Sequence, residues 1–191
     1  MVKLGFIVEG ATEKIILEQS DFFSYLSSLK IDFIKDVENA EGNGNLLPHN
    51  IEKHAGTLAS KGATDIFILT DLDRDKCITE TKKRINPAAN HIAVISIHEI
   101  EAWFLSDTEA IRKCINTPDY ACTNPESIAE PFDEIIGLLK TSTGRGIGRH
   151  GEIRLVKRML RNGFSIRKAA EHPNCNSAKY FLKKIKELTT L

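Results

Sequence analysis

No apolar run in the sequence approaches the roughly 20 residues that a helix needs to cross a bilayer. The short apolar stretch at the N-terminus reaches Glu9 within ten residues, which argues against a secretory signal peptide. Only four cysteines are present and none forms a C-x-x-C pair, so neither a disulfide framework nor a zinc ribbon is indicated. We therefore expect a cytoplasmic globular protein with reduced cysteines and no membrane partner.

The chain also has no net charge at pH 7, because its 26 Lys and Arg residues balance its 26 Asp and Glu residues. The balance hides an asymmetry along the chain. Residues 140–191 hold 13 basic and 3 acidic residues, whereas residues 1–139 hold 13 basic and 23 acidic ones. An acidic body with a basic C-terminal segment indicates a polyanionic partner, carboxylates gathered round a metal ion, or both.

The first hundred residues alternate apolar strands with amphipathic helices. Strands are expected at 2–8, 31–35, 65–70 and 91–97, helices at 13–29, 46–61 and 77–85, and a loop at 39–45. Continuously apolar strands separated by helices indicate a parallel sheet that is covered on both faces. After Glu99 the pattern is helical. The sequence thus predicts an α/β fold, with a mainly parallel four-stranded, Rossmann-like core at 1–105 and a helical extension at 106–191.

Carboxylates follow three of the four expected strands. They are Glu9 after the first strand, Asp71, Asp73 and Asp75 after the third, and Glu99 and Glu101 after the fourth. Because the carboxyl ends of parallel strands share one edge of the sheet, these side chains should converge there. Bare carboxylates repel one another, and a hard divalent cation such as Mg²⁺ or Mn²⁺ removes that repulsion. The pattern therefore predicts a metal site suited to phosphoryl-transfer chemistry.

Two of these stretches resemble the Toprim domain, the metal-binding catalytic module of topoisomerases, primases and the overcoming-lysogenization-defect nucleases. They are VEGATEK at Val8–Lys14 and LTDLDRD at Leu69–Asp75. Two further stretches, IHEIEAWFL at Ile97–Leu105 and CNSAKYFL at Cys175–Leu182, are similar to a Toprim-like family of unknown function found beside ATPases in bacterial defence clusters.

The resemblance implies a role for each acid. Glu9 matches a general acid/base or metal ligand, Asp71 and Asp73 match the metal-binding pair, and these three are the expected catalytic residues. Asp75 matches a third acid of some members, and Glu101 matches the acid of the Glu-Ala-Trp signature, which extends the expected ligand set to five. No tyrosine-bearing topoisomerase domain and no primase zinc module is recognisable. That leaves the nuclease branch or a non-catalytic Toprim domain.

The basic C-terminal segment supports two interpretations. Residues 165–186 resemble the helix-turn-helix of resolvases, whose second helix enters the major groove. The alternative is an amphipathic helical cap whose Lys and Arg side chains are solvated. In either case a sequence-independent phosphate-binding surface is expected from Arg145, Arg149, Arg154, Lys157 and Arg158. The formal G-x-G-x-x-G at 146–151 follows a helical stretch, so it does not indicate a dinucleotide site.

The leading functional prediction is a Mg²⁺- or Mn²⁺-dependent Toprim-type nuclease that hydrolyses DNA or RNA, in phage defence or DNA repair. The alternative is a non-catalytic, nucleic-acid-binding regulatory partner of an ATPase with a resolvase-like tail. A haloacid-dehalogenase-type phosphatase fits poorly, because that family places its Asp-x-Asp after the first strand rather than the third.

Overall fold

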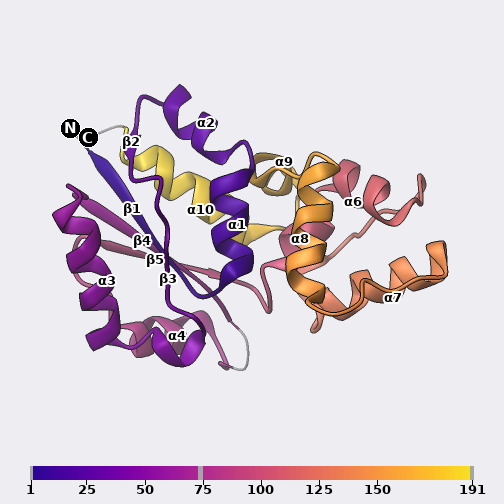
Figure 1. Cartoon of the computed structure of the whole chain (residues 1–191), viewed down its shortest axis with the longest axis horizontal. Coiled ribbons are helices and arrows are strands. Elements are labelled where there is room, and N and C mark those ends of the chain that lie inside the picture. Colours follow the sequence, from indigo (N-terminus) through magenta and orange to yellow (C-terminus); the bar gives the residue numbers. More distant parts are fainter. Residues whose placement is uncertain (1, 73–74, 190–191) are drawn as a thin grey trace.

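The computed structural model describes residues 2–72 and 75–189, which form a parallel sheet with helices on both faces (Figure 1). The strands are β1 (Lys3–Val8), β2 (Asp32–Phe33), β3 (Glu38–Asn39), β4 (Asp65–Asp71) and β5 (His91–Ser96). They lie in the order β2-β1-β4-β5, β3 also pairs with β1, and every pairing is parallel. The predicted α/β class with a parallel sheet and a helical C-terminal region is confirmed.

The strand beside β1 is divided in two, so the sheet of the described residues has five strands rather than four. β2 lies within the expected strand at 31–35 and pairs with the start of β1. β3 follows that range, includes the first residue of the expected loop at 39–45, and pairs with the end of β1. The break between them has a physical cause in α1 (Ala11–Gln19). The N–H of Val37 donates to Glu18 Oε1 (3.2 Å), and its carbonyl accepts from Lys14 Nζ (2.6 Å). Side chains thus take the backbone groups that would otherwise continue the ladder.

Ten α-helices and two 3₁₀ turns are present in the described part of the chain. The helices are α1 (Ala11–Gln19), α2 (Phe22–Ser28), α3 (Pro48–Ser60), α4 (Ile78–Ile85), α5 (Glu101–Ser106), α6 (Thr108–Ile115), α7 (Pro131–Thr143), α8 (Gly151–Arg161), α9 (Ile166–Glu171) and α10 (Asn176–Glu187), and the turns are η1 (Asn43–Asn45) and η2 (Pro125–Ser127). Within the described residues, none is both long and apolar enough to cross a membrane. In Figure 1, α6, α7 and α8 lie beyond one end of the sheet.

Alternating side chains of the central strands fill two hydrophobic clusters, one on each face of the sheet. Phe6 and Phe67 belong to the larger cluster, which α1, α2, α5 and α10 cover. Ile7 and Ile68 belong to the smaller cluster beneath α3. Gly5 permits the close approach of α3, since a Cβ at this position would lie 2.9 Å from the Leu58 side chain. Two covered faces account for the continuously apolar strands.

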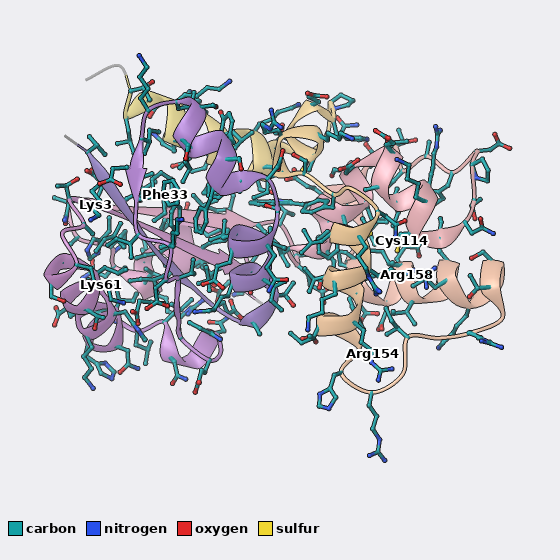
Figure 2. All side chains as sticks on the ribbon, turned by 45° about the horizontal axis from the view of Figure 1, so that its top comes forward. Lys3, Phe33, Lys61, Cys114, Arg154 and Arg158 are labelled. Atoms are coloured by element: carbon teal, nitrogen blue, oxygen red, sulfur yellow. The ribbon has the colours of Figure 1, made fainter. Side chains whose placement is uncertain are left out.

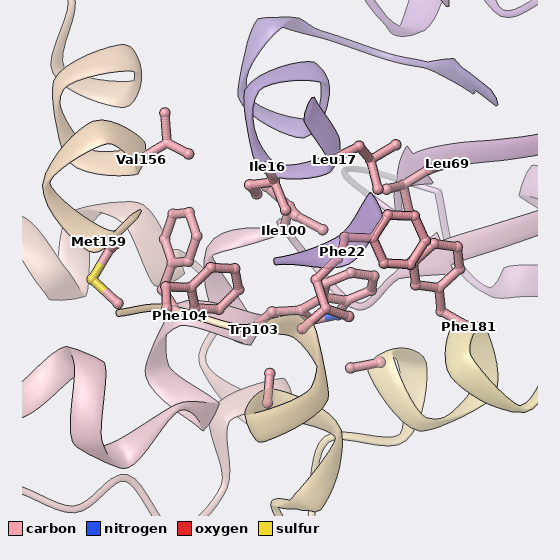
Figure 3. Close-up of a cluster of buried hydrophobic side chains, with 14 of the residues drawn as sticks. Ile16, Leu17, Phe22, Leu69, Ile100, Trp103, Phe104, Val156, Met159 and Phe181 are labelled. Carbon is pink, nitrogen blue, oxygen red and sulfur yellow. The ribbon is translucent and has the colours of Figure 1, made fainter. Parts of the chain in front are cut away.

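The C-terminal helices share the larger cluster with the sheet (Figure 3). The buried ring of Phe181 on α10 stacks on Phe22 at 5.2 Å and on Trp103 at 5.7 Å, and it meets Phe67 edge-on at 5.7 Å. Trp103 Nε1 also donates to Ser177 Oγ at 2.8 Å. The expected division at residue 105 stays a prediction, and the hydrophobic core is continuous across it.

We expect Phe181→Ala to lower the free energy of unfolding by about 3–5 kcal/mol, the usual cost of removing a buried aromatic ring. The reason is that three other rings lose their partner at once. Urea unfolding followed by circular dichroism measures the change.

The matched control is Lys183→Ala on the same helix, where the side chain is exposed and a change within about 0.5 kcal/mol is expected. A similar, small loss in both variants would contradict the shared core.

Candidate functional site

Glu9 and Asp71 meet at the carboxyl edge of the sheet, as the sequence predicts. Glu9 follows β1, and its Oε2 accepts hydrogen bonds from Thr70 Oγ1 (2.5 Å) and from the N–H of Asp71 (3.2 Å). Asp71 ends β4, and its Oδ1 accepts a hydrogen bond from the hydroxyl of Ser96, which ends β5. Parallel register therefore brings the ends of three adjacent strands together, and each carboxylate is oriented by a neighbouring hydroxyl.

Two further carboxyl groups are buried beside this pair. Glu13 lies in the first turn of α1, is 3% exposed, and accepts a hydrogen bond from the N–H of Gly10 at 3.1 Å. Glu101 is the first residue of α5 and is 4% exposed. Neither takes part in a salt bridge within the described residues. Both are therefore buried acids without a cationic partner.

Burial governs the protonation of these groups. It raises the pKa of Glu13 to about 7, with a further contribution from the charge of Glu9. It raises the pKa of Glu101 to about 8, with contributions from Glu99 and Glu13. Burial, followed by the charges of Glu13 and Glu101, also raises the pKa of Asp71 well above its usual value. The mutual charge effects show that these groups form one electrostatic unit, which we call the acidic cluster: Glu9, Glu13, Asp71 and Glu101.

Glu13 is a member of the cluster for which the sequence predicts no role. The expected helix begins at residue 13, whereas α1 begins at Ala11 after Gly10, so that the Glu13 side chain turns back to the Gly10 N–H. The signal in the sequence is its place in the VEGATEK stretch, four residues after Glu9.

The other predicted acids lie in different surroundings. Asp75 pairs with Arg84 on α4, through Nε at 3.2 Å and Nη2 at 3.1 Å. A hydrogen bond from Thr81, followed by Arg84, lowers the pKa of Asp75. Asp73 lies outside the described residues. Glu99 Oε2 accepts the N–H of Phe132 (2.9 Å) at the start of α7. The structure therefore gathers Glu9, Asp71 and Glu101 but directs Asp75 to an internal ion pair.

Carboxylate oxygens are the ligands that Mg²⁺ and Mn²⁺ prefer, so the donors of the acidic cluster fit such an ion chemically. A cation would also offset the repulsion that the raised pKa values express. Over residues 2–72 and 75–189, however, no three His, Cys, Asp or Glu side chains already converge as a metal-binding group. Coordination by several members of the cluster would therefore require their side chains to rotate.

The start of α8 borders the acidic cluster. The charge of Glu152, in the first turn of α8, contributes to the raised pKa values of Glu13 and Glu101, and α8 packs on α1. The N-terminal end of α8 therefore lies near Glu13 and Glu101, and the basic loop leads into it. In that region, Arg145, Arg149, Arg154 and Lys157 are exposed.

Arg158 differs from the other predicted phosphate-binding residues (Figure 2). Its Nε and Nη2 donate to the carbonyl of Cys114 at 3.0 Å and 2.5 Å, which ties α8 to α6. Arg154, in contrast, lies at the loop end of α8 and donates one bond to the carbonyl of Ile147 at 3.2 Å. Arg158 thus has a structural role, whereas the other four remain candidates for phosphate contacts.

The resolvase-like segment forms two helices, α9 and α10, joined by residues 172–175. One face of α10 is buried through Phe181 and Ile185, while Lys183 and Lys186 are exposed. This amphipathic arrangement provides a basic outer face, and entry of α10 into a DNA groove stays a prediction.

A family model described as a domain of unknown function (DUF4276) matches residues 8–186. The chain belongs to this family. No curated protein and no solved structure matches the chain. The DUF4276 match begins at the end of β1 and extends into α10, so one family domain contains both the acidic cluster and the basic segment.

Without a cation, the stability of the protein should fall as the pH rises from about 4.5 to 8. Below pH 4.5, Glu13 and Glu101 are protonated in both the folded and the unfolded chain, and their contribution to the stability of the protein is fully present. Above pH 4.5 these carboxyl groups ionise in the unfolded chain but stay protonated in the folded protein, so the free energy of unfolding decreases. The decrease ends when the folded groups ionise in turn, near pH 7 for Glu13 and near pH 8 for Glu101. Glu101→Gln should flatten this slope and stabilise the protein at pH 8 by a few kcal/mol, since one pKa unit corresponds to about 1.4 kcal/mol.

Urea unfolding at pH 5 and pH 8 in a chelator measures the effect. Glu109→Gln is the matched control, because Lys113 and Lys168 lower the pKa of Glu109 to about 2 and the group is ionised throughout this range. A native protein equally stable at both pH values would contradict the burial of uncompensated acids.

Proposed function

We propose that this protein is a Mg²⁺- or Mn²⁺-dependent nuclease of Toprim type, which hydrolyses phosphodiester bonds in DNA or RNA. The observation that carries the proposal is the acidic cluster, in which Glu9 and Asp71 end adjacent parallel strands with Glu13 and Glu101 buried beside them. Glu9, Glu13 and Asp71 would hold the cation. When bound, the cation supplies positive charge that stabilises the phosphate oxygens during hydrolysis.

The chain itself orients the acids and lowers their access to water. The hydroxyl of Thr70 holds Glu9 and that of Ser96 holds Asp71, so each of these carboxylates has a hydrogen-bond donor while no cation is bound. Burial of Glu101 keeps its carboxyl protonated at neutral pH in the absence of a cation. A carboxyl group with a pKa near the working pH suits proton transfer to or from the reacting oxygen.

The basic loop supports a nucleic acid as the substrate class. Arg145, Arg149 and Arg154 are exposed just before and within the first turn of α8, which borders the acidic cluster. Cationic side chains bind the phosphate backbone without reading its sequence. A role in phage defence or DNA repair beside an ATPase rests on the family resemblance alone, and a cytoplasmic location is supported by four free cysteines.

A second candidate function, a non-catalytic nucleic-acid-binding regulator, is favoured by one observation. The raised pKa values of Glu13 and Glu101 allow protons to neutralise these two acids without a cation. Such a protein would bind nucleic acid through the same basic loop and leave it intact.

With Mg²⁺ or Mn²⁺, we expect the purified protein to nick plasmid DNA or degrade RNA. Glu9→Gln and Asp71→Asn keep the size of each side chain but remove its charge, and each should lower the rate about a hundredfold or more. Gel-based cleavage assays measure the rates. Glu109→Gln, on the exposed surface of α6, should retain native activity.

Equal cleavage by the native protein and both variants would identify a contaminant and contradict the nuclease proposal. Calorimetric titration then separates the two candidate functions. Nucleic-acid binding without uptake of Mg²⁺ or Mn²⁺ would favour the regulator.

The arginines provide a separate test of substrate binding. Arg149→Ala should weaken nucleic-acid binding and reduce the salt dependence of the affinity by about one phosphate contact. Arg158→Ala should leave the salt dependence unchanged and lower the free energy of unfolding by about 1–3 kcal/mol, because the Cys114 carbonyl loses its donor. Binding isotherms at several salt concentrations, together with urea unfolding, distinguish the two effects. An equal loss of salt dependence in both variants would contradict the phosphate contact of Arg149 and the structural role of Arg158.

A further inference from the structure

An apolar pocket of about 440 Å³ lies along the outer side of β5. Its lining comes from β5 and the residue that follows it (Ala93, Ile95, Ile97), from α4 (Ile78, Lys82), from α10 (Asn176, Ser177, Tyr180) and from η2 (Glu126). Ile78 is 40% exposed, and no other large hydrophobic side chain is exposed in the described part of the chain. The volume lies in the range of about 300–1,000 Å³ that is typical of small-ligand pockets.

The pocket and the acidic cluster meet at the end of the same strand. Ser96, whose hydroxyl donates to Asp71, stands between Ile95 and Ile97 in the chain. Successive side chains of a strand point to opposite faces, so Ile95 and Ile97 project away from the Asp71 side. Ser96 therefore links the two sites, because its side chain contacts Asp71 and both of its neighbours in the chain line the pocket.

Tyr180 gives the pocket an aromatic wall with positive charge beside it. The Nζ of Lys82 lies 5.1 Å from the centre of the ring, and the Nζ of Lys184 lies 5.6 Å from it. An aromatic face with neighbouring cations suits a nucleotide, since the ring stacks on a base while the ammonium groups attract phosphates. The Lys82–Tyr180 contact also links α4 to α10 across the open edge of β5, which opposes the addition of a peptide strand there.

The polar rim of the pocket is held rigidly. Glu126 Oε2 accepts the N–H of Asn176 (2.9 Å), and its Oε1 accepts the N–H of Ser177 (2.7 Å), so this carboxylate caps α10. Within the described residues, the side-chain amide of Asn176 makes no hydrogen bond of its own. Amide side chains recognise the edges of unstacked bases.

We infer that this pocket binds one unstacked nucleobase of a single-stranded substrate, next to the phosphodiester bond that is cut. The base stacks on Tyr180, its edge reaches Asn176, and its neighbouring phosphate lies near Lys82, since Lys184 is paired with Glu187. This inference rests on the proposed nuclease function and names the form of its substrate, a strand whose bases are not paired.

The test uses a set of single-stranded oligonucleotides, each of which carries the fluorescent base 2-aminopurine at one position. The protein is titrated into each oligonucleotide, with Ca²⁺ in place of Mg²⁺. We expect strong quenching at one position with the native protein and with Tyr180→Phe. Tyr180→Leu should lose the quenching and bind about 5- to 100-fold more weakly, the range found when a stacking ring is removed. Ile78→Ala and Asn176→Ala should weaken binding in the same direction, and Lys179→Ala, on α10 but outside the pocket, should bind normally.

Cleavage in Mg²⁺ separates the inference from the proposed function. An abasic site at the quenched position should slow cleavage by the native protein. It should not slow cleavage by Tyr180→Leu any further. Cleavage that is unchanged both in Tyr180→Leu and by the abasic site overturns the base pocket and leaves the nuclease intact. Quenching that depends on Tyr180, without cleavage, supports the pocket and overturns the nuclease.

Discussion

The central physical constraint in this protein is the gathering of four carboxyl groups at one edge of a parallel sheet, of which Glu13 and Glu101 are buried and Glu9 and Asp71 are partly exposed. Negative charges cannot be confined in this way without compensation, so the acidic cluster must hold protons or a cation. The raised pKa values of Glu13 and Glu101 are consistent with a protonated cluster, and its carboxylate oxygens are of the type that binds a cation. Exchange between these two states would couple the fold, the metal and the reaction, because neutralising the cluster stabilises the protein whichever species does it.

Much of this arrangement was predictable from the sequence, because apolar strands separated by helices leave few topologies and parallel strands end at one edge. The meeting of Glu9 and Asp71 at the carboxyl edge of the sheet follows directly from that rule. The ion pair that takes Asp75 depends on where Arg84 points, and the tie between Arg158 and Cys114 joins residues far apart in the chain. Neither has a local sequence signal, since each is decided by tertiary packing.

The continuous core fixes the acidic and basic parts of the chain relative to one another. Phe181 packs against rings from α2, β4 and α5, and α8 packs against α1. The family match likewise covers both parts. The charge asymmetry of the sequence therefore becomes a fixed geometry, in which the basic segment and the acidic cluster keep one relative orientation.

The divided strand beside β1 has a consequence for behaviour at high concentration. A long, regular edge strand offers unpaired backbone groups to other molecules and is a recognised route to aggregation. At this edge the ladder is broken at Val37, whose N–H and carbonyl are bonded to Glu18 and Lys14. At the opposite edge, Tyr180 and Lys82 meet across β5. Each edge of the sheet thus carries a feature that hinders edge-to-edge association, so a protein with five parallel strands is protected against polymerising through them.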